Sequence, residues 1–179
     1  MVEIKTLSSR TVYQNQWMRL REDSIERKDG SQGIYSVVEK PDFAVILPVE
    51  GDQVYVVEQY RYPLGVRTLE LPQGAWELSP GEAPETVARG ELAEETGLRA
   101  RTLTWVGYQK LAQGYSTQGY HIWLASDFEQ GAQALDAEEI GLVCRHMPVS
   151  EFAGRIASGE ITDATSVSAF LLARLKGLV

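Results

Sequence analysis

The first forty residues contain two segments of strand-like pattern separated by a turn. Met18–Arg27 alternates loosely between apolar and polar residues, and Gly33–Glu39 resumes a similar pattern. Between them, Lys28-Asp29-Gly30 is typical of the tight turn of a β-hairpin. We therefore expect a small antiparallel sheet over residues 1–40.

Apolar runs of strand length dominate the middle of the chain. Phe43–Val49 is a continuous apolar run, and Gly51-Asp52 turns it into Val54–Gln59, which indicates a central hairpin. Further strand-like runs are Thr68–Leu71, Leu103–Tyr108, Tyr120–Leu124 and Ile140–His146.

Three segments are predicted to be helical. The first is Pro84–Thr96, because proline suits the first turn of a helix and Gly97 suits the position just after its end. Ser150–Ser158 and Thr165–Leu178 follow near the end of the chain. Since the helices are inserted singly among strands, the pattern predicts a mixed α/β fold rather than regular βαβ winding. Residues 41–179 are expected to form the main domain.

Composition excludes some classes of protein. The balance of 44% apolar and 23% charged residues is ordinary for a soluble globular protein. A net charge of −8 argues against binding to nucleic acid or to an anionic membrane, because both need a positive field. An anionic substrate stays possible if metal ions supply local positive charge. No apolar run approaches the ~20 residues of a membrane span, so we expect a cytoplasmic protein.

The first predicted helix concentrates negative charge in its last turns. On a helical wheel Glu91, Glu94 and Glu95 share an arc of about 100°, and Val87, Ala88 and Leu92 lie in or beside it. A solvated acidic face is the simplest interpretation of such a cluster. Two features oppose it: the carboxylates lie on the apolar side, and they repel one another where the helix dipole also disfavours anions. A hard divalent cation would relieve both conflicts.

These residues resemble a known family motif. Gly74, Glu82 and Glu91-Leu92-Ala93-Glu94-Glu95-Thr96-Gly97-Leu98 resemble the Nudix box, in which a glycine and a glutamate precede REUxEExGU, where U is a bulky apolar residue. Three further segments resemble the ADP-ribose pyrophosphatase branch, namely Gln59-Tyr60-Arg61, Glu70-Leu71-Pro72-Gln73-Gly74 and Gly159-Glu160-Ile161-Thr162-Asp163. The resemblance extends from about Val12 onward. It implies a Nudix fold with α/β/α layers and a small N-terminal sheet.

Two departures from the family pattern stand out. Seven residues rather than five separate Gly74 from Glu82, which lengthens the loop. The family arginine falls at position 90, which here is Gly90, and Arg89 lies about 160° from Glu91 on the wheel. Either another cation orients the glutamates, or the chain is a weak or inactive member.

Nudix enzymes hydrolyse a pyrophosphate bond with water and Mg²⁺ or Mn²⁺. By resemblance, Glu91 and Glu95 are the expected main metal ligands, with Glu94 in support. The same resemblance makes the Gln73 carbonyl a further ligand and Glu82 an accessory one.

In the ADP-ribose branch another glutamate, from a loop after the box, acts as base or ligand. We expect it within Leu135–Glu139, with Glu139 as first choice and Glu138 as second. A solvated loop charge is the alternative for both residues.

The resemblance also assigns substrate-binding residues. Arg61 resembles the arginine that touches substrate phosphate, although a surface charge at a strand end is the alternative. Tyr13 and Trp17 lie near the N-terminal sheet, which in relatives holds the nucleotide base across a homodimer; core or dimer packing is the simpler role for either. Trp76, in the lengthened loop, either shapes substrate entry or caps the core.

The leading hypothesis is therefore a hydrolase of ADP-ribose or of a nucleotide sugar such as GDP-mannose. A nucleoside triphosphate pyrophosphohydrolase is a second possibility, but the forty residues ahead of the core argue against it. A non-catalytic Nudix ligand-binding module is a third. Gly90 favours that module, whereas the retained Glu91, Glu94 and Glu95 disfavour it, because they repel one another without metal.

Overall fold

The computed structural model describes residues 3–76, 79, 81–136 and 139–179. The described elements follow the order β1 (Ile4–Gln14), β2 (Arg19–Arg27), β3 (Gln32–Glu39), β4 (Phe43–Glu50), β5 (Gln53–Arg61), β6 (Val66–Glu70), β7 (Gln73–Gly74), α1 (Pro84–Thr96), β8 (Leu98–Lys110), β9 (Gly119–Gln130), β10 (Val143–Pro148), α2 (Val149–Ala157) and α3 (Ala164–Leu175).

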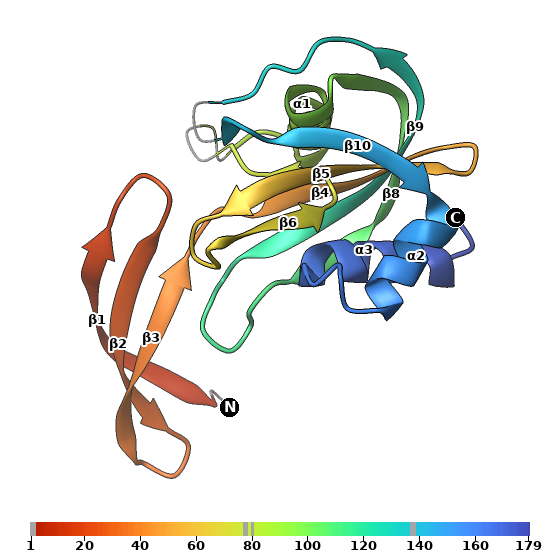
Figure 1. Ribbon diagram of the computed structural model, residues 1–179. Coiled ribbons are helices and arrows are strands. Elements are labelled where there is room, and N and C mark those ends of the chain that lie inside the picture. Colours follow the sequence, from red (N-terminus) through yellow and green to blue (C-terminus); the bar gives the residue numbers. More distant parts are fainter. Residues whose placement is uncertain (1–2, 77–78, 80, 137–138) are drawn as a thin grey trace.

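The N-terminal sheet is antiparallel, has the order β1-β2-β3 and extends away from the main body (Figure 1). The predicted turn is present, with Gly30 in the left-handed region at φ 82° and its N–H donating to the Arg27 carbonyl at 2.9 Å. Strand β1 was not singled out by the sequence pattern. Every β1 residue is exposed, so the strand lacks the alternation that burial of one face imposes.

The main sheet has the order β10-β5-β4-β9-β8, with β6 paired to β5 and β7 paired to β4. The predicted central hairpin exists, but β4 and β5 pair only next to their turn, at Val49↔Val54 and Glu50↔Gln53. Beyond that point β4 pairs in parallel with β9 and antiparallel with β7. This divergence opens the sheet beside β7, where the candidate site lies.

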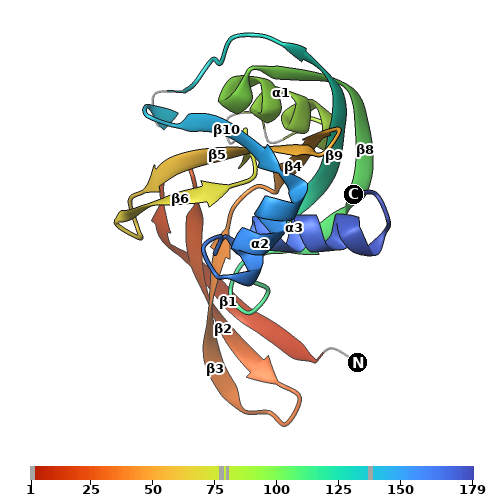
Figure 2. The same ribbon diagram turned by 45° about the vertical axis from the view of Figure 1, so that its right-hand side comes forward.

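Strand β4 separates two hydrophobic clusters because successive side chains point to opposite faces of a sheet. Val45 packs in one cluster with Phe152 of α2 and Phe170 of α3, whereas Ile46 packs in the other with Leu92 of α1. Helix α1 therefore covers one face, and α2 and α3 cover the other (Figure 2). The expected α/β/α layers are confirmed, and burial on both faces explains why β4 is apolar without alternation.

Some predicted bounds are wrong at their ends. Helix α3 ends at Leu175 rather than Leu178, since Gly177 adopts the left-handed conformation at φ 68° and stops the helix. The strand predicted from Ile140 begins at Val143, and Ile140 itself is 84% exposed. Strands β8 and β9 are longer than the apolar runs that predicted them, because their outer ends are polar.

The two sheets are joined by the loop before β9. Val38 donates to the Tyr115 carbonyl at 2.8 Å, and the Tyr35 hydroxyl donates to the Gly114 carbonyl at 2.7 Å. Over the described residues, no helix has both the length and the apolar character needed to span a bilayer.

Candidate active site

Helix α1 holds two glutamates inside the protein. It begins at Pro84 and ends at Gly97, which adopts φ 76° and donates its N–H to the Ala93 carbonyl at 2.9 Å. Glu91 is 4% exposed and Glu95 is 1% exposed, alongside the apolar residues that pack on the sheet. The carboxylates therefore do not form a solvated acidic face.

Thr96 is buried although it lies about 140° from Glu91 on the helical wheel. Its hydroxyl donates to the Leu92 carbonyl and accepts the Leu98 N–H at 3.0 Å. The reason is that the chain turns back into β8 directly after Thr96, so the sheet covers this side of the last turn.

Three carboxylates from two distant segments converge. Ligand atoms of Glu91, Glu95 and Glu139 all lie within 4.8 Å of one another. Glu139 comes from the loop before β10, where its backbone N–H donates to the Asp136 carbonyl and its carboxylate accepts the Asp136 N–H, both at 3.0 Å. The first choice for the loop glutamate thus lies beside the helix glutamates, while Glu138 falls outside the described residues.

Burial and mutual repulsion act on this cluster. Burial, reinforced by the charges of Glu91 and Glu139, holds the pKa of Glu95 well above its ordinary value. Burial also raises the pKa of Glu139. Each shift means that the folded protein disfavours the ionised form when no cation is bound. Oxygen donors crowded in this way fit a hard divalent cation.

Strand β7 brings main chain to the cluster. The Gln73 N–H donates to Glu95 Oε2 at 3.0 Å. A Cβ atom on Gly74 would lie 2.2 Å from Glu91 Oε2 and 2.6 Å from its Cδ, so the backbone of the strand lies directly against that carboxylate. The Gln73 carbonyl stays a predicted ligand, now placed on the strand that touches both helix glutamates.

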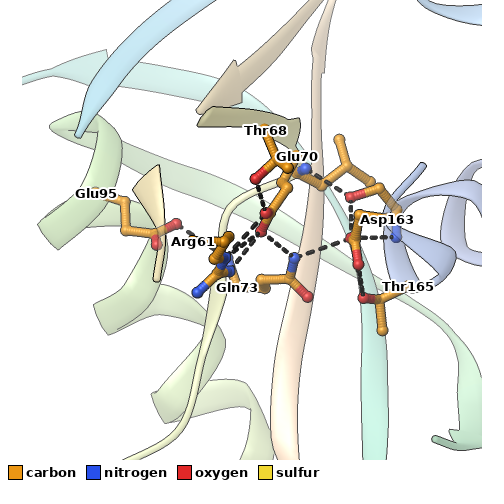
Figure 3. A network of polar contacts seen from close by, with 9 residues as sticks. Arg61, Thr68, Glu70, Gln73, Glu95, Asp163 and Thr165 are labelled. Carbon is orange, nitrogen blue, oxygen red and sulfur yellow. Dashed lines mark hydrogen bonds and ion pairs between the residues drawn. The ribbon is translucent and has the colours of Figure 1, made fainter. Parts of the chain in front are cut away.

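A second group of polar residues adjoins the first (Figure 3). Arg61 donates through Nε to Glu70 Oε1 at 2.9 Å and also pairs with that carboxylate through Nη2. Thr68 donates to the same carboxylate at 2.5 Å. The Gln73 amide donates to both Glu70 and Asp163 at 3.0 Å. Gln73 therefore contacts Glu70 and Asp163 through its side-chain amide and Glu95 through its backbone N–H.

Asp163 caps helix α3. It accepts the Ser166 N–H at 2.9 Å, the Ser166 hydroxyl at 2.6 Å and the Thr165 hydroxyl at 2.8 Å. Burial opposes the charge of Asp163, but these donors and Gln73 outweigh burial and hold its pKa below the ordinary value. This carboxylate is thus stable as an anion within the protein alone.

A cavity of about 540 Å³ opens over these residues, within the range typical of small-molecule sites. Its lining includes Arg61, Glu70, Gln73, Gly74 and Asp163. The rest of the lining includes Lys40, Phe43, Leu111 and Gln118. Because Gly74 and Gln73 also touch Glu91 and Glu95, the carboxylate cluster borders the cavity through β7.

The remaining predicted residues lie outside the three-carboxylate cluster. Glu94 is half-buried on α1, and Glu82 is exposed beside a separate, smaller cavity. Arg89 points away, donating to Glu85 at 2.8 Å and to the Ala100 carbonyl at 2.7 Å.

Tyr13 and Trp17 are 53% and 40% exposed, so packing in the core of this chain is wrong for both. Their expected roles in base binding or dimer packing stay predictions.

Two residues of the site were not proposed from the sequence, Glu70 and Asp163. Both lie in segments quoted for the resemblance, Glu70–Gly74 and Gly159–Asp163. The signal was therefore present, but nothing in the sequence showed that Gln73 would join them.

Comparison with known proteins agrees with this architecture. A model of the nucleoside diphosphate sugar hydrolase N-terminal domain matches residues 4–38, and a model of the NUDIX domain matches residues 39–170. The fold and the carboxylate site therefore define a member of a known class: the chain belongs to the Nudix family.

Two named relatives and one solved structure are similar to nearly the whole chain. The chain is 30% identical over 171 residues to ADP-ribose pyrophosphatase of Mycobacterium tuberculosis (strain ATCC 25618 / H37Rv), covering 94% of this chain and 82% of that protein. It is 27% identical over 178 residues to ADP-ribose pyrophosphatase of Bacillus subtilis (strain 168), covering 98% and 95%. A solved structure titled as that of an ADP compounds hydrolase superposes with a TM-score of 0.86 at 22% identity, covering 100% of this chain and 98% of that one.

Proposed function

We propose that this Nudix hydrolase cleaves the pyrophosphate bond of a nucleoside diphosphate linked to another group, with Mg²⁺ or Mn²⁺ as cofactor. ADP-ribose is the first substrate to test, since two relatives carry the name ADP-ribose pyrophosphatase. A nucleotide sugar is the second, since the model matching residues 4–38 is described by that substrate class. The single observation that carries the proposal is the convergence of Glu91, Glu95 and Glu139 beside the cavity.

The carboxylates supply the metal site in this proposal. Glu91 and Glu95 would hold the cation, and the Gln73 carbonyl would add a neutral oxygen. Glu94 and Glu82, which lie outside the three-carboxylate cluster, would have supporting roles. When bound, the cation neutralises phosphate oxygens and lowers the pKa of a coordinated water. The protein's part is to keep the carboxylate oxygens crowded and largely shielded from solvent before the cation arrives.

Glu139 accepts the proton from the attacking water. The water oxygen forms a bond to one phosphorus while the bond from that phosphorus to the bridging oxygen breaks, which gives two monophosphates. Burial raises the pKa of Glu139 toward the working range of a general base. Arg61 lines the cavity while Glu70 fixes its guanidinium, so it is oriented to donate to a phosphate oxygen.

The N-terminal sheet is proposed to form a homodimer. It exposes several large apolar side chains: Ile4, Leu7, Val12, Tyr13, Trp17, Ile34 and Tyr35. Apolar surface of this extent is typical of an interface. In the dimer, Tyr13 and Trp17 hold the substrate base or pack against the partner. Light scattering of Leu7→Lys/Val12→Lys should show a monomer, and a monomeric wild type would contradict this part of the proposal.

A substrate screen tests the proposed activity. Wild-type protein with Mg²⁺ or Mn²⁺ is incubated with ADP-ribose, GDP-mannose, dinucleotides and nucleoside triphosphates, and products are separated by ion-exchange chromatography. We expect AMP and ribose 5-phosphate from ADP-ribose, or the matching pair of monophosphates from another member of the class. Turnover of triphosphates alone would replace the proposal with the pyrophosphohydrolase alternative. Binding without turnover of any substrate would favour the ligand-binding module.

A further inference from the structure

The position of the absent family arginine is sterically closed. A Cβ atom on Gly90 would lie 2.0 Å from Cζ2 of Trp76, 2.8 Å from Cη2 and 3.0 Å from Cε2. These distances lie at or below the closest approach that real Cβ atoms make, and the obstacle is a rigid ring. The indole of Trp76 therefore occupies the space into which a side chain at position 90 would grow. Gly90 is the residue that this contact requires.

The same ring reaches the next turn of the helix. Glu94 follows Gly90 by four residues and so lies on the same face of α1. The ring that lies against Gly90 is therefore adjacent to Glu94, and its indole N–H, which can only donate, is suited to a carboxylate acceptor. The tryptophan is itself held in the loop after β7, where its carbonyl accepts the Ser79 N–H at 2.9 Å.

No arginine of α1 takes over the missing role, since Arg89 is occupied by Glu85 and by the Ala100 carbonyl. We infer that Trp76 replaces the family arginine as the positioning residue for Glu94, and that Trp76 and Gly90 form one coupled pair. The inference rests on the proposed metal-dependent hydrolysis and goes beyond it. The replacement is not equivalent electrostatically, because a neutral single donor stands where a charged, forked donor is usual.

Melting temperatures test the pair without any reference to activity. Gly90→Ala in the wild-type background should lower the melting temperature by about 5 °C, because the new methyl overpacks against the ring. In a Trp76→Ala background the same change should raise it by about 2 °C, since alanine is then simply the better helix former. An effect of equal sign and size in both backgrounds would overturn the pairing.

Trp76→Phe tests the positioning role, because it removes the indole N–H and keeps an aromatic ring at position 76, while the smaller phenyl ring gives up the outer indole atoms that contact Gly90. We expect kcat to fall about tenfold with KM nearly unchanged, and Mn²⁺ affinity measured by electron paramagnetic resonance to weaken about tenfold. Trp105→Phe, at an exposed position of β8, is the matched control and should change neither kcat nor Mn²⁺ affinity. Wild-type kcat and wild-type Mn²⁺ affinity in Trp76→Phe would overturn the role.

Rescue separates positioning from general packing. Trp76→Ala/Gly90→Arg rebuilds the usual family arrangement in the space that the ring vacates. It should bind Mn²⁺ and turn over substrate at least tenfold better than Trp76→Ala alone. No gain over Trp76→Ala would contradict the inference. If wild-type protein cleaved none of the substrates, the proposed function would fall, whereas Mn²⁺ affinity and the change of sign in melting temperature would still decide this inference.

Discussion

Gln73 contacts two groups of carboxylates, Glu70 with Asp163 and the cluster of Glu91, Glu95 and Glu139. The two groups differ in the hydrogen bonds that the protein donates to them. Asp163 and Glu70 receive hydrogen bonds from Arg61, Thr68, Gln73 and the first turn of α3 (Figure 3). Glu95 and Glu139 instead crowd together with Glu91, and burial raises the pKa of both. The pKa of partly buried Asp163 shifts in the opposite direction, downward.

The contrast shows that burial alone does not identify a functional carboxylate. A buried carboxylate that receives several protein donors belongs to the scaffold, since folding already stabilises its charge. A buried carboxylate crowded by like charges makes the fold less stable until a proton or a cation arrives. Opposite responses of the two groups to the same kind of substitution are therefore expected.

The largest expected effect is that of Glu95→Gln on catalysis. Glutamine keeps the shape and can still accept the Gln73 N–H, but it removes a metal-binding charge. We expect kcat/KM to fall by about 10³-fold or more, and the metal-free protein to melt at a higher temperature than wild type. Glu85→Gln, exposed on the same helix, is the control and should keep wild-type values. Full turnover by Glu95→Gln would show that the metal site lies elsewhere.

Asp163→Ala should have the opposite effect on stability. It removes the cap of α3 and leaves the Gln73 amide, two hydroxyls and a backbone N–H without their acceptor. The free energy of unfolding, measured in urea, should fall by about 2–3 kcal/mol. Asp163→Asn keeps a capping oxygen and should lose less. If Asp163→Ala were as stable as wild type, the division into scaffold and metal-binding carboxylates would be wrong.

The smallest effect concerns pH. Because the folded-state pKa of Glu95 lies above its ordinary value of 4.5, the folded protein binds protons that the unfolded chain releases. This contribution to the stability of metal-free protein is present at low pH and is lost as pH rises above about 4.5. The pKa of Asp163 is lowered from 3.8, so its contribution to stability has the opposite pH dependence. That contribution is present above about pH 3.8 and is lost as pH falls further.

Differential scanning calorimetry in EDTA provides the measurement. Wild type should lose stability between pH 5 and pH 8 more steeply than Glu95→Gln does. Adding Mg²⁺ at pH 8 should raise the melting temperature of wild type, because the cation binds the folded state, and should leave Glu95→Gln nearly unchanged. Parallel pH profiles for the two proteins would contradict the raised pKa of Glu95.

Much of the site could be predicted because its signals are local. Pro84 and Gly97 fix the ends of α1 through their own backbone preferences, and the four-residue spacing of Glu91 and Glu95 places them on one face. The choice of Glu139 depended on the family resemblance, since nothing in a loop sequence gives its distance from a helix forty residues away. Glu138 and the roles of Glu82 and Glu94 stay predictions.

The remainder depends on contacts that leave no periodic pattern. Strand β1 has no buried face, so no alternation marks it. The bonds from Gln73 to Glu70 and Asp163 join segments that the fold alone brings together. Gly90 looked like a defect in the family motif, and only the position of the Trp76 ring shows what the glycine accommodates.

The contact between Trp76 and Gly90 also constrains how this enzyme can change over generations. An arginine at position 90 meets the ring, and a chain that loses the tryptophan first loses the donor proposed for Glu94. Each single substitution would give a less stable or less active protein, so substitutions at the two positions should occur together. Lineages of this enzyme should carry tryptophan with glycine or arginine with a smaller loop residue, and mixed pairs should be rare.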